Sequence, residues 1–162
     1  MLALLLVAAG APAAVWLDVP FVKQEKNGCG AAAIAMVIDY WHRNAAADAR
    51  QIHHSLYSDA AKGVVADDMA RYFQERGFEV FMFAGEWTDL GRHLSKGRPL
   101  IVALDSGRSH YVVVAGLDEQ RDLVMLNDPA RKKLAAMRRA EFEQQWKTTG
   151  NWTLLAVPRQ VR

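Results

Sequence analysis

A single cysteine stands between two glycines at the start of a strongly helical segment. It lies in Asn27-Gly28-Cys29-Gly30, which leads into residues 31–41 (AAAIAMVIDYW), where apolar residues recur at helical spacing. This order places the thiol at a helix N-terminus, where unpaired N–H groups and the positive end of the macrodipole favour thiolate over thiol. The flanking glycines leave room for another backbone to approach. A cysteine that only fills a core needs neither feature, so Cys29 is a candidate nucleophile.

The chain has the size and composition of one packed domain. It contains 162 residues, of which 51% are hydrophobic and 23% are charged. Its 20 basic and 18 acidic residues occur without a long run of either sign, so binding of nucleic acid is not indicated. We interpret a short basic patch as a solvated face. The patch consists of Arg131, Lys132, Lys133, Arg138 and Arg139.

The first residues differ from the rest of the chain. Residues 1–10 (MLALLLVAAG) are apolar and uncharged, and residues 11–13 (APA) supply the small-x-small pattern that signal peptidase accepts. The apolar run is shorter than the roughly 20 residues that span a bilayer. We therefore expect residues 1–14 to be a signal peptide or a short apolar leader, and residues 15–162 to form one domain. An extracytoplasmic location follows, periplasmic or secreted, with the apolar segment as an alternative membrane tether.

A thiol nucleophile needs a general base, and the chain has five histidines. His110 immediately precedes residues 111–116 (YVVVAG), a β-branched run that predicts a buried strand. A histidine at the mouth of a central strand can face a helix N-terminus that packs on the same sheet. We interpret the other four histidines, in polar helical stretches, as surface residues. They are His42, His53, His54 and His93.

A third side chain should hold the imidazole through its other ring nitrogen. Residues 111–126 have the pattern of a β-hairpin, with turn-forming residues at 118–122. Antiparallel pairing returns the end of the second strand to the start of the first. Asp128 is therefore expected beside His110. Asn127 is the alternative, since an amide can do the same task.

Acyl transfer also needs donors for the negative charge that develops on the carbonyl oxygen. Two candidates lie near the thiol: the backbone N–H of Cys29 and the side-chain amide of Gln24. We expect neither a metal nor a cofactor, because no cluster of ligating residues occurs at a metal-binding spacing.

The other segments predict an α+β fold, with helices first and a mostly antiparallel sheet after them. Helical spacing occurs at residues 48–57, 66–76, 87–95 and 139–147, and strand patterns occur at 78–83, 98–104 and 152–157.

The motifs together resemble the peptidase C39 family of papain-like cysteine peptidases. The resemblance lies in residues 19–24 (VPFVKQ) and 29–32 (CGAA), then in 110–113 (HYVV) and 127–129 (NDP), in family order across residues 19–158. It implies a papain-like fold in which the nucleophile helix packs on a mostly antiparallel sheet.

The resemblance also implies the site and the activity. The site is a Cys-His-Asp triad at Cys29, His110 and Asp128, with Gln24 as the oxyanion donor. Gln24 precedes Cys29 by five positions, one fewer than is usual in the family. The implied activity is hydrolysis of peptide bonds through a thioester acyl-enzyme, in the processing of a leader or exported peptide. The family includes the bacteriocin-processing domains of peptide-exporting ABC transporters, so a peptide substrate and association with an exporter or a membrane are expected.

Two other classes of protein fit the same residues. One is an amidase or a transglutaminase-like acyl transferase, which would use the same three side chains. The other is a catalytically silent module that binds a peptide as an accessory to an exporter.

Overall fold

The computed structural model describes residues 14–43 and 45–160, and its centre is an antiparallel sheet of seven strands. The strands are β1 (Val15–Trp16), β4 (Phe78–Ala84), β5 (Leu100–Asp105), β6 (Ser109–Asp118), β7 (Leu123–Asn127), β8 (Ala135–Arg138) and β9 (Trp152–Pro158). They lie in the order β4-β9-β5-β6-β7-β8, and β1 pairs with β6. Strands β2 (Tyr57–Ser58) and β3 (Gly63–Val64) form a separate hairpin.

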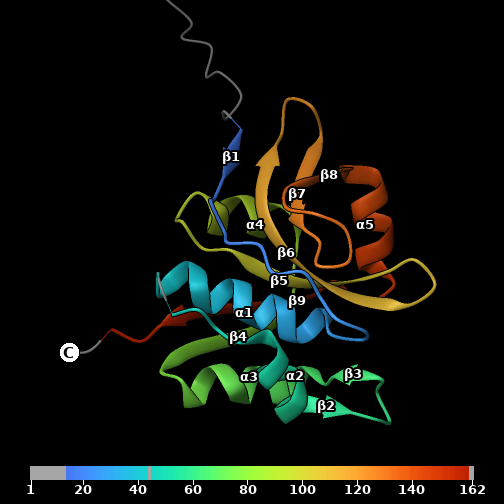
Figure 1. Cartoon of the computed structure of the whole chain (residues 1–162). Helices are drawn as coiled ribbons and strands as arrows, with labels where there is room; N and C mark the ends of the chain where they lie inside the picture. The colour runs from blue at the N-terminus through green and yellow to red at the C-terminus, as the bar shows by residue number, and fades with distance from the viewer. Residues whose placement is uncertain (1–13, 44, 161–162) are drawn as a thin grey trace, which may run out of the picture.

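Helices cover both faces of the large sheet (Figure 1). One face carries α1 (Cys29–Trp41), α2 (Ala49–Leu56) and α3 (Ala66–Glu75), and the other carries α4 (Trp87–Leu94) and α5 (Arg139–Lys147). Successive strand residues point to opposite faces. Val113 of β6 therefore packs in the core beneath α1, whereas Val112 and Val114 pack in the core with α4 and α5. The apolar run at the start of β6 is thus buried on both sides.

Helix α1 lies between the sheet and the other two helices of its face. Every residue from Gly30 to Ile38 is buried, so the helix has no solvent-facing side over most of its length. Small residues permit this close packing. A Cβ on Gly30 would lie 2.8 Å from the Cβ of Val64 in β3. Gly30 therefore gives β3 room against the start of the helix, whereas the sequence suggested that it leaves room for a substrate.

The expected α+β class is confirmed, and the main helices and strands follow the predicted order. Four short strands were not predicted: β1, β2, β3 and β8. Strand β8 begins with Ala135 and Ala136, which lack the β-branched or aromatic side chains that mark a strand in a sequence. It forms because β7 offers an unpaired edge.

Candidate active site

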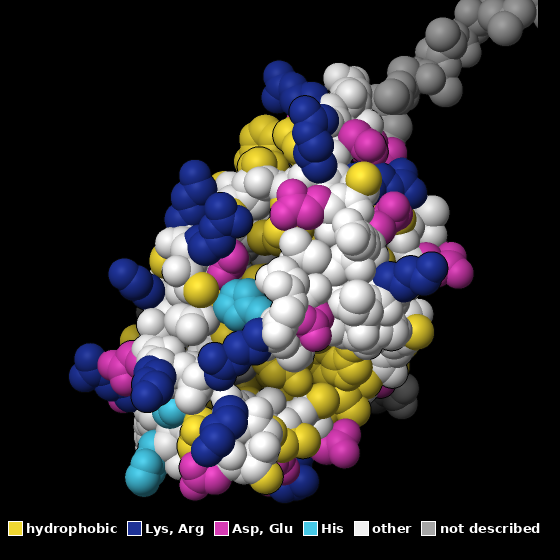
Figure 2. Space-filling model, turned by 90° about the vertical axis from the view of Figure 1, so that its right-hand side faces the viewer, with side chains coloured by type: hydrophobic (Ala, Val, Ile, Leu, Met, Phe, Trp, Pro, Cys, Tyr) yellow, Lys and Arg dark blue, Asp and Glu magenta, His cyan; other side chains and the backbone are white. Residues whose placement is uncertain are grey.

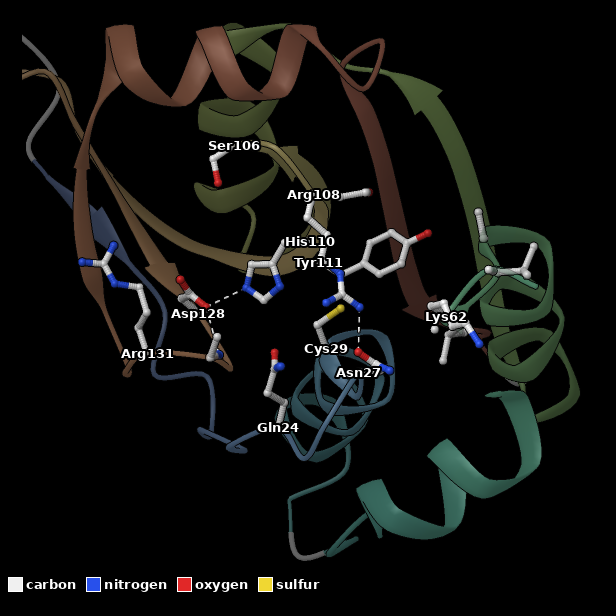
Figure 3. A pocket seen from close by; sticks show the side chains of 17 residues that line it. Gln24, Asn27, Cys29, Lys62, Ser106, Arg108, His110, Tyr111, Asp128 and Arg131 are labelled. Carbon is white, nitrogen blue, oxygen red and sulfur yellow. Dashed lines mark hydrogen bonds and ion pairs between the residues drawn. The ribbon is translucent and has the colours of Figure 1, made fainter. Parts of the chain in front are cut away.

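The thiol of Cys29 opens into a cavity of about 680 Å³ (Figure 3). Cys29 is the first residue of α1, directly after the cap residue Gly28. The walls come from the start of β6, the β2–β3 hairpin, the β5–β6 loop and the loop after β7. The helix N-terminus predicted for the cysteine is therefore present, and it lies where several loops converge.

His110 and Asp128 are joined by a hydrogen bond on the wall of this cavity. Nε2 of His110 lies 2.7 Å from Oδ1 of Asp128. The register of β6 and β7 pairs Val113 with Asn127, so the chain that leaves β7 passes beside the start of β6. The backbone N–H of Ala130 donates to the same Oδ1 at 3.0 Å and fixes the carboxylate. The expected juxtaposition of the two side chains is confirmed, and the hairpin is its cause.

Cys29 faces the same imidazole (Figure 3). Burial alone would raise the pKa of the thiol, but hydrogen bonding to His110, the backbone N–H of Tyr111 and the charge of His110 together hold that pKa below its ordinary value. Burial lowers the pKa of His110, yet Asp128 and Cys29 outweigh it and raise this pKa to about 9. These opposite shifts favour a thiolate beside an imidazolium at neutral pH.

Asp128 is the anion that supports this pair. Its burial raises its pKa, but the hydrogen bond and charge of His110, the N–H of Ala130 and the charge of Arg131 bring the pKa below its usual range. The carboxylate is therefore ionised at neutral pH and accepts the Nε2–H of His110, which leaves Nδ1 for the thiol.

Asn127 does not reach the imidazole. Its side chain is fully buried, Nδ2 donates to the carbonyl of Val19 at 3.0 Å, and Oδ1 accepts from the N–H of Leu134 at 3.0 Å. The amide thus ties the segment that leads to Gln24 to the loop that follows Asp128. These contacts exclude Asn127 as the alternative partner of the His110 imidazole.

Replacement of Asn127 by leucine is expected to lower the free energy of unfolding by about 2–4 kcal/mol, because two buried backbone groups lose their partners. Urea unfolding of Asn127→Leu beside Gln144→Leu, a change at an exposed amide, measures the effect. An orienting role would instead leave stability unchanged and shift the pH dependence of Cys29 alkylation.

Gln24 lies across the cavity from the strands. Its backbone N–H donates to the carbonyl of Pro129 at 3.0 Å, which links its segment to the loop after Asp128. Its side chain points toward the space between Cys29 and His110 (Figure 3). Oε1 is buried and has no hydrogen-bond partner within residues 14–43 and 45–160. The shorter spacing to Cys29 therefore still brings the amide to the cavity.

Several cavity residues were not predicted from the sequence. Nη2 of Arg108 in the β5–β6 loop donates to Oδ1 of Asn27 at 2.6 Å, a contact between residues 81 positions apart. Lys62 and Arg131 line the same cavity. Arg131 belonged to a recognised basic patch, but no local pattern shows which loop tips meet in the folded chain.

The prediction for the four other histidines is only half right. His42 and His54 are exposed, but His53 and His93 are half-buried, and Nδ1 of each is buried. Helical polarity identified the exposed pair and missed the packing of the other two.

Several solved structures have a similar fold, and those reported below are described as peptidases or proteases. A double glycine motif protease from an AMS/PCAT transporter, in complex with the leader peptide, has a TM-score of 0.73 at 24% identity and covers 90% of this chain and 95% of its own. A protein from Bacillus anthracis that is described as a C39-like peptidase has a TM-score of 0.75 at 17% identity, and the match covers 93% of this chain and 100% of that protein. The peptidase domain of Streptococcus ComA, a bi-functional ABC transporter, has a TM-score of 0.69 at 21% identity, and the match covers 86% of this chain and 97% of that domain. The expected papain-like fold is confirmed.

The expectation of an extracytoplasmic location, with the apolar start as a tether, is wrong. The similar structures include a protease from an AMS/PCAT transporter and the peptidase domain of a bi-functional ABC transporter. The expectation rested on residues 1–13, which lie outside the described part of the chain. The apolar character of this segment was a weak basis for predicting export, because residues 1–10 lack the basic residues of a secretory signal.

Sequence comparison identifies the family. A search of curated proteins found no match. A family model described as the Peptidase_C39 like family matches residues 16–154, which include all four predicted site residues. The chain belongs to the Peptidase_C39 like family.

Proposed function

We propose that this chain is a cysteine peptidase with Cys29 as nucleophile, His110 as general base and Asp128 as the residue that orients the base. The observation that carries the proposal is the chain of contacts from the Cys29 thiol through the imidazole to the Asp128 carboxylate, on the wall of an open cavity. Membership of a peptidase-like family supports it.

The reaction takes place in two halves. The thiolate of Cys29 attacks the peptide carbonyl carbon, and the C=O electron pair moves to oxygen. Collapse of this intermediate breaks the C–N bond, and the departing amine takes a proton from the imidazolium of His110, which leaves a thioester. His110 then removes a proton from water as the water attacks the thioester. Expulsion of the thiolate releases the acid and restores the starting pair.

Two donors are proposed for the oxyanion. The N–H of Cys29 is at the first position of α1, where the helix offers it no carbonyl partner. The Gln24 amide supplies the second donor from the opposite wall. A donor aimed at the developing charge acts in the transition state more than in the bound substrate.

Replacement of Gln24 by alanine is therefore expected to lower kcat by about 10²–10³-fold, with a small change in KM. Steady-state kinetics of Gln24→Ala beside Gln74→Ala, an exposed amide on α3, measures this. An unchanged kcat in Gln24→Ala would remove Gln24 from the mechanism and leave the Cys29 N–H as donor.

The substrate that we propose is a leader peptide or another exported peptide, and the partner is a peptide exporter. A similar structure is described as a double glycine motif protease in complex with the leader peptide, and another as part of an ABC transporter. Residues 15–162 would form the peptidase domain that acts on this substrate.

Digestion of a proteome-derived peptide library, read by mass spectrometry, tests the activity. We expect new peptide termini that disappear after Cys29 has been alkylated with iodoacetamide. An added primary amine separates hydrolysis from acyl transfer: amide products without new free carboxyl termini would mean an acyl transferase. Peptide binding without either product would mean a silent binding module.

A further inference from the structure

The cavity around Cys29 is lined by cations from three separate parts of the chain. Lys62 comes from the β2–β3 hairpin, Arg108 from the β5–β6 loop and Arg131 from the loop after β7. Asp128 is the acidic residue of the lining, and it is 8% exposed and bound to His110. The lining therefore presents positive charge to an entering molecule.

Arg108 is exposed and lies beside the nucleophile loop. Its guanidinium donates to the Asn27 amide at 2.6 Å, two positions before Cys29. This contact holds the side chain in place but does not neutralise it, because the amide is uncharged. The nearby carboxylate of Asp105 accepts instead from the backbone N–H of Gly107 at 2.7 Å. The N–H groups of Arg108 that do not bind Asn27 can donate hydrogen bonds to a carboxylate.

Arg131 lies beyond Asp128 as seen from His110 in Figure 3. Its backbone N–H donates to the Asp128 carbonyl at 2.9 Å, which fixes the loop, and its side chain is exposed. Lys62 is less available, because Asp59 lies 3.7 Å from its Nζ. Arg108 and Arg131 are therefore the cations of the lining that are most available to bind an anion.

The basic patch seen in the sequence divides in the folded chain. Lys133 pairs with Asp18 at 2.5 Å, and Arg139 pairs with Glu143 at 2.9 Å. Arg131, in contrast, lines the cavity. Figure 2 shows a histidine ring in a hollow on one face, with several Lys and Arg side chains around it. The five basic residues of the sequence patch therefore do not form one solvated face, because two of them are paired with acidic residues and Arg131 lines the cavity.

We propose that the cavity selects peptides that carry acidic side chains beside the bond to be cleaved, and that Arg108 and Arg131 bind those carboxylates. The proposal rests on the peptidase function proposed above and adds the substrate class. Planar guanidinium groups match carboxylates in geometry and bind them with two parallel hydrogen bonds. A concave site lined by one sign of charge also concentrates ligands of the opposite sign.

The charge of the cavity is tested first without any peptide. Iodoacetate and iodoacetamide alkylate Cys29 by the same step, in which the thiolate displaces iodide and a thioether forms, but only iodoacetate is anionic. We expect the ratio of the iodoacetate rate to the iodoacetamide rate to fall about two- to fivefold in Arg108→Gln and in Arg131→Gln. The wild-type ratio should also fall as salt rises from about 0.01 M to about 1 M, because the Debye length shrinks from about 30 to about 3 Å.

Arg121→Gln is the matched control. Arg121 is an exposed arginine in the turn after β6, whose ten residues place that turn about 33 Å along the sheet from the cavity. It should leave the ratio unchanged. A ratio that is the same in wild type, Arg108→Gln and Arg131→Gln would overturn the proposal, as would an equal fall in Arg121→Gln.

The library digest tests selection itself. We expect Asp and Glu to be enriched next to the cleaved bonds, and this enrichment to fall in the double variant Arg108→Gln/Arg131→Gln. Cleavage without acidic enrichment would overturn the proposed selection and leave the peptidase function standing. A library that is not cleaved would overturn the peptidase function, while the alkylation ratio would still decide whether the cavity binds carboxylates.

Discussion

Replacing Cys29 with alanine is expected to lower the rate of peptide hydrolysis by about 10⁶-fold, because a nucleophile that acts with its base as one unit has no substitute. The fold should persist. Cys29 is only partly buried at the first turn of α1, and the helix is held by the buried residues from Gly30 to Ile38. Initial rates on a peptide from the library digest measure the loss, and circular dichroism with urea unfolding reports the fold.

Because Cys29 is the only cysteine in the sequence, the Cys29→Ala variant has no thiol that iodoacetamide can alkylate. Hydrolysis by a folded Cys29→Ala protein at more than about a thousandth of the wild-type rate would be inconsistent with thiol catalysis.

Replacing His110 with glutamine is expected to lower hydrolysis by about 10⁴-fold or more. The hydrogen bond and the charge of the imidazole help to lower the pKa of the thiol, and the pKa of His110 itself, raised to about 9, keeps it protonated for the departing amine. Glutamine keeps a polar side chain but cannot carry that proton. Rates on the same library peptide measure the effect, with His54→Gln on α2 as the control at an exposed histidine.

A His110→Gln protein that hydrolyses the peptide within tenfold of wild type would show that another group acts as the base. Among the described residues, no other histidine lines the Cys29 cavity, so that base would have to be a group of another type or water.

The parts of the site that could be predicted from the sequence depend on local order in the chain. Cys29 directly precedes a helix, so its place at the helix N-terminus needs no tertiary information. His110 lies near the start of β6, and Asp128 directly follows β7, the second strand of the same hairpin. Antiparallel pairing therefore brings Nε2 of His110 to 2.7 Å from Oδ1 of Asp128. Each relation spans few residues, and a simple pattern expresses it.

The parts that could not be predicted depend on how distant loops meet. The contact of Arg108 with Asn27 joins residues 81 positions apart, and no periodicity in either segment indicates it. Asn127 shows the same limit. Its amide forms a structural link to Val19, 108 positions away, which a reading of the Asn-Asp-Pro sequence alone cannot separate from a role at the imidazole.

Helix α1 was predicted in position but not in environment. A stripe of large apolar residues indicated one buried side, yet the packing of α2, α3 and β3 buries it on all sides from Gly30 to Ile38. Alanines and glycine show little periodic signal, because they fit both a buried and an exposed helix face. The close approach of Val64 to Gly30 therefore emerges only from the folded chain.

The pairing of thiolate and imidazolium is tested most directly by the rate of Cys29 alkylation with iodoacetamide as a function of pH, in wild type and in His110→Gln. We expect the wild-type rate to reach its plateau below the usual thiol pKa, with a second change near pH 9, where His110 loses its proton. In His110→Gln the rise should move to higher pH and the second change should vanish. A single rise near pH ~8.5, the value of a free thiol, in both proteins would contradict the ion pair.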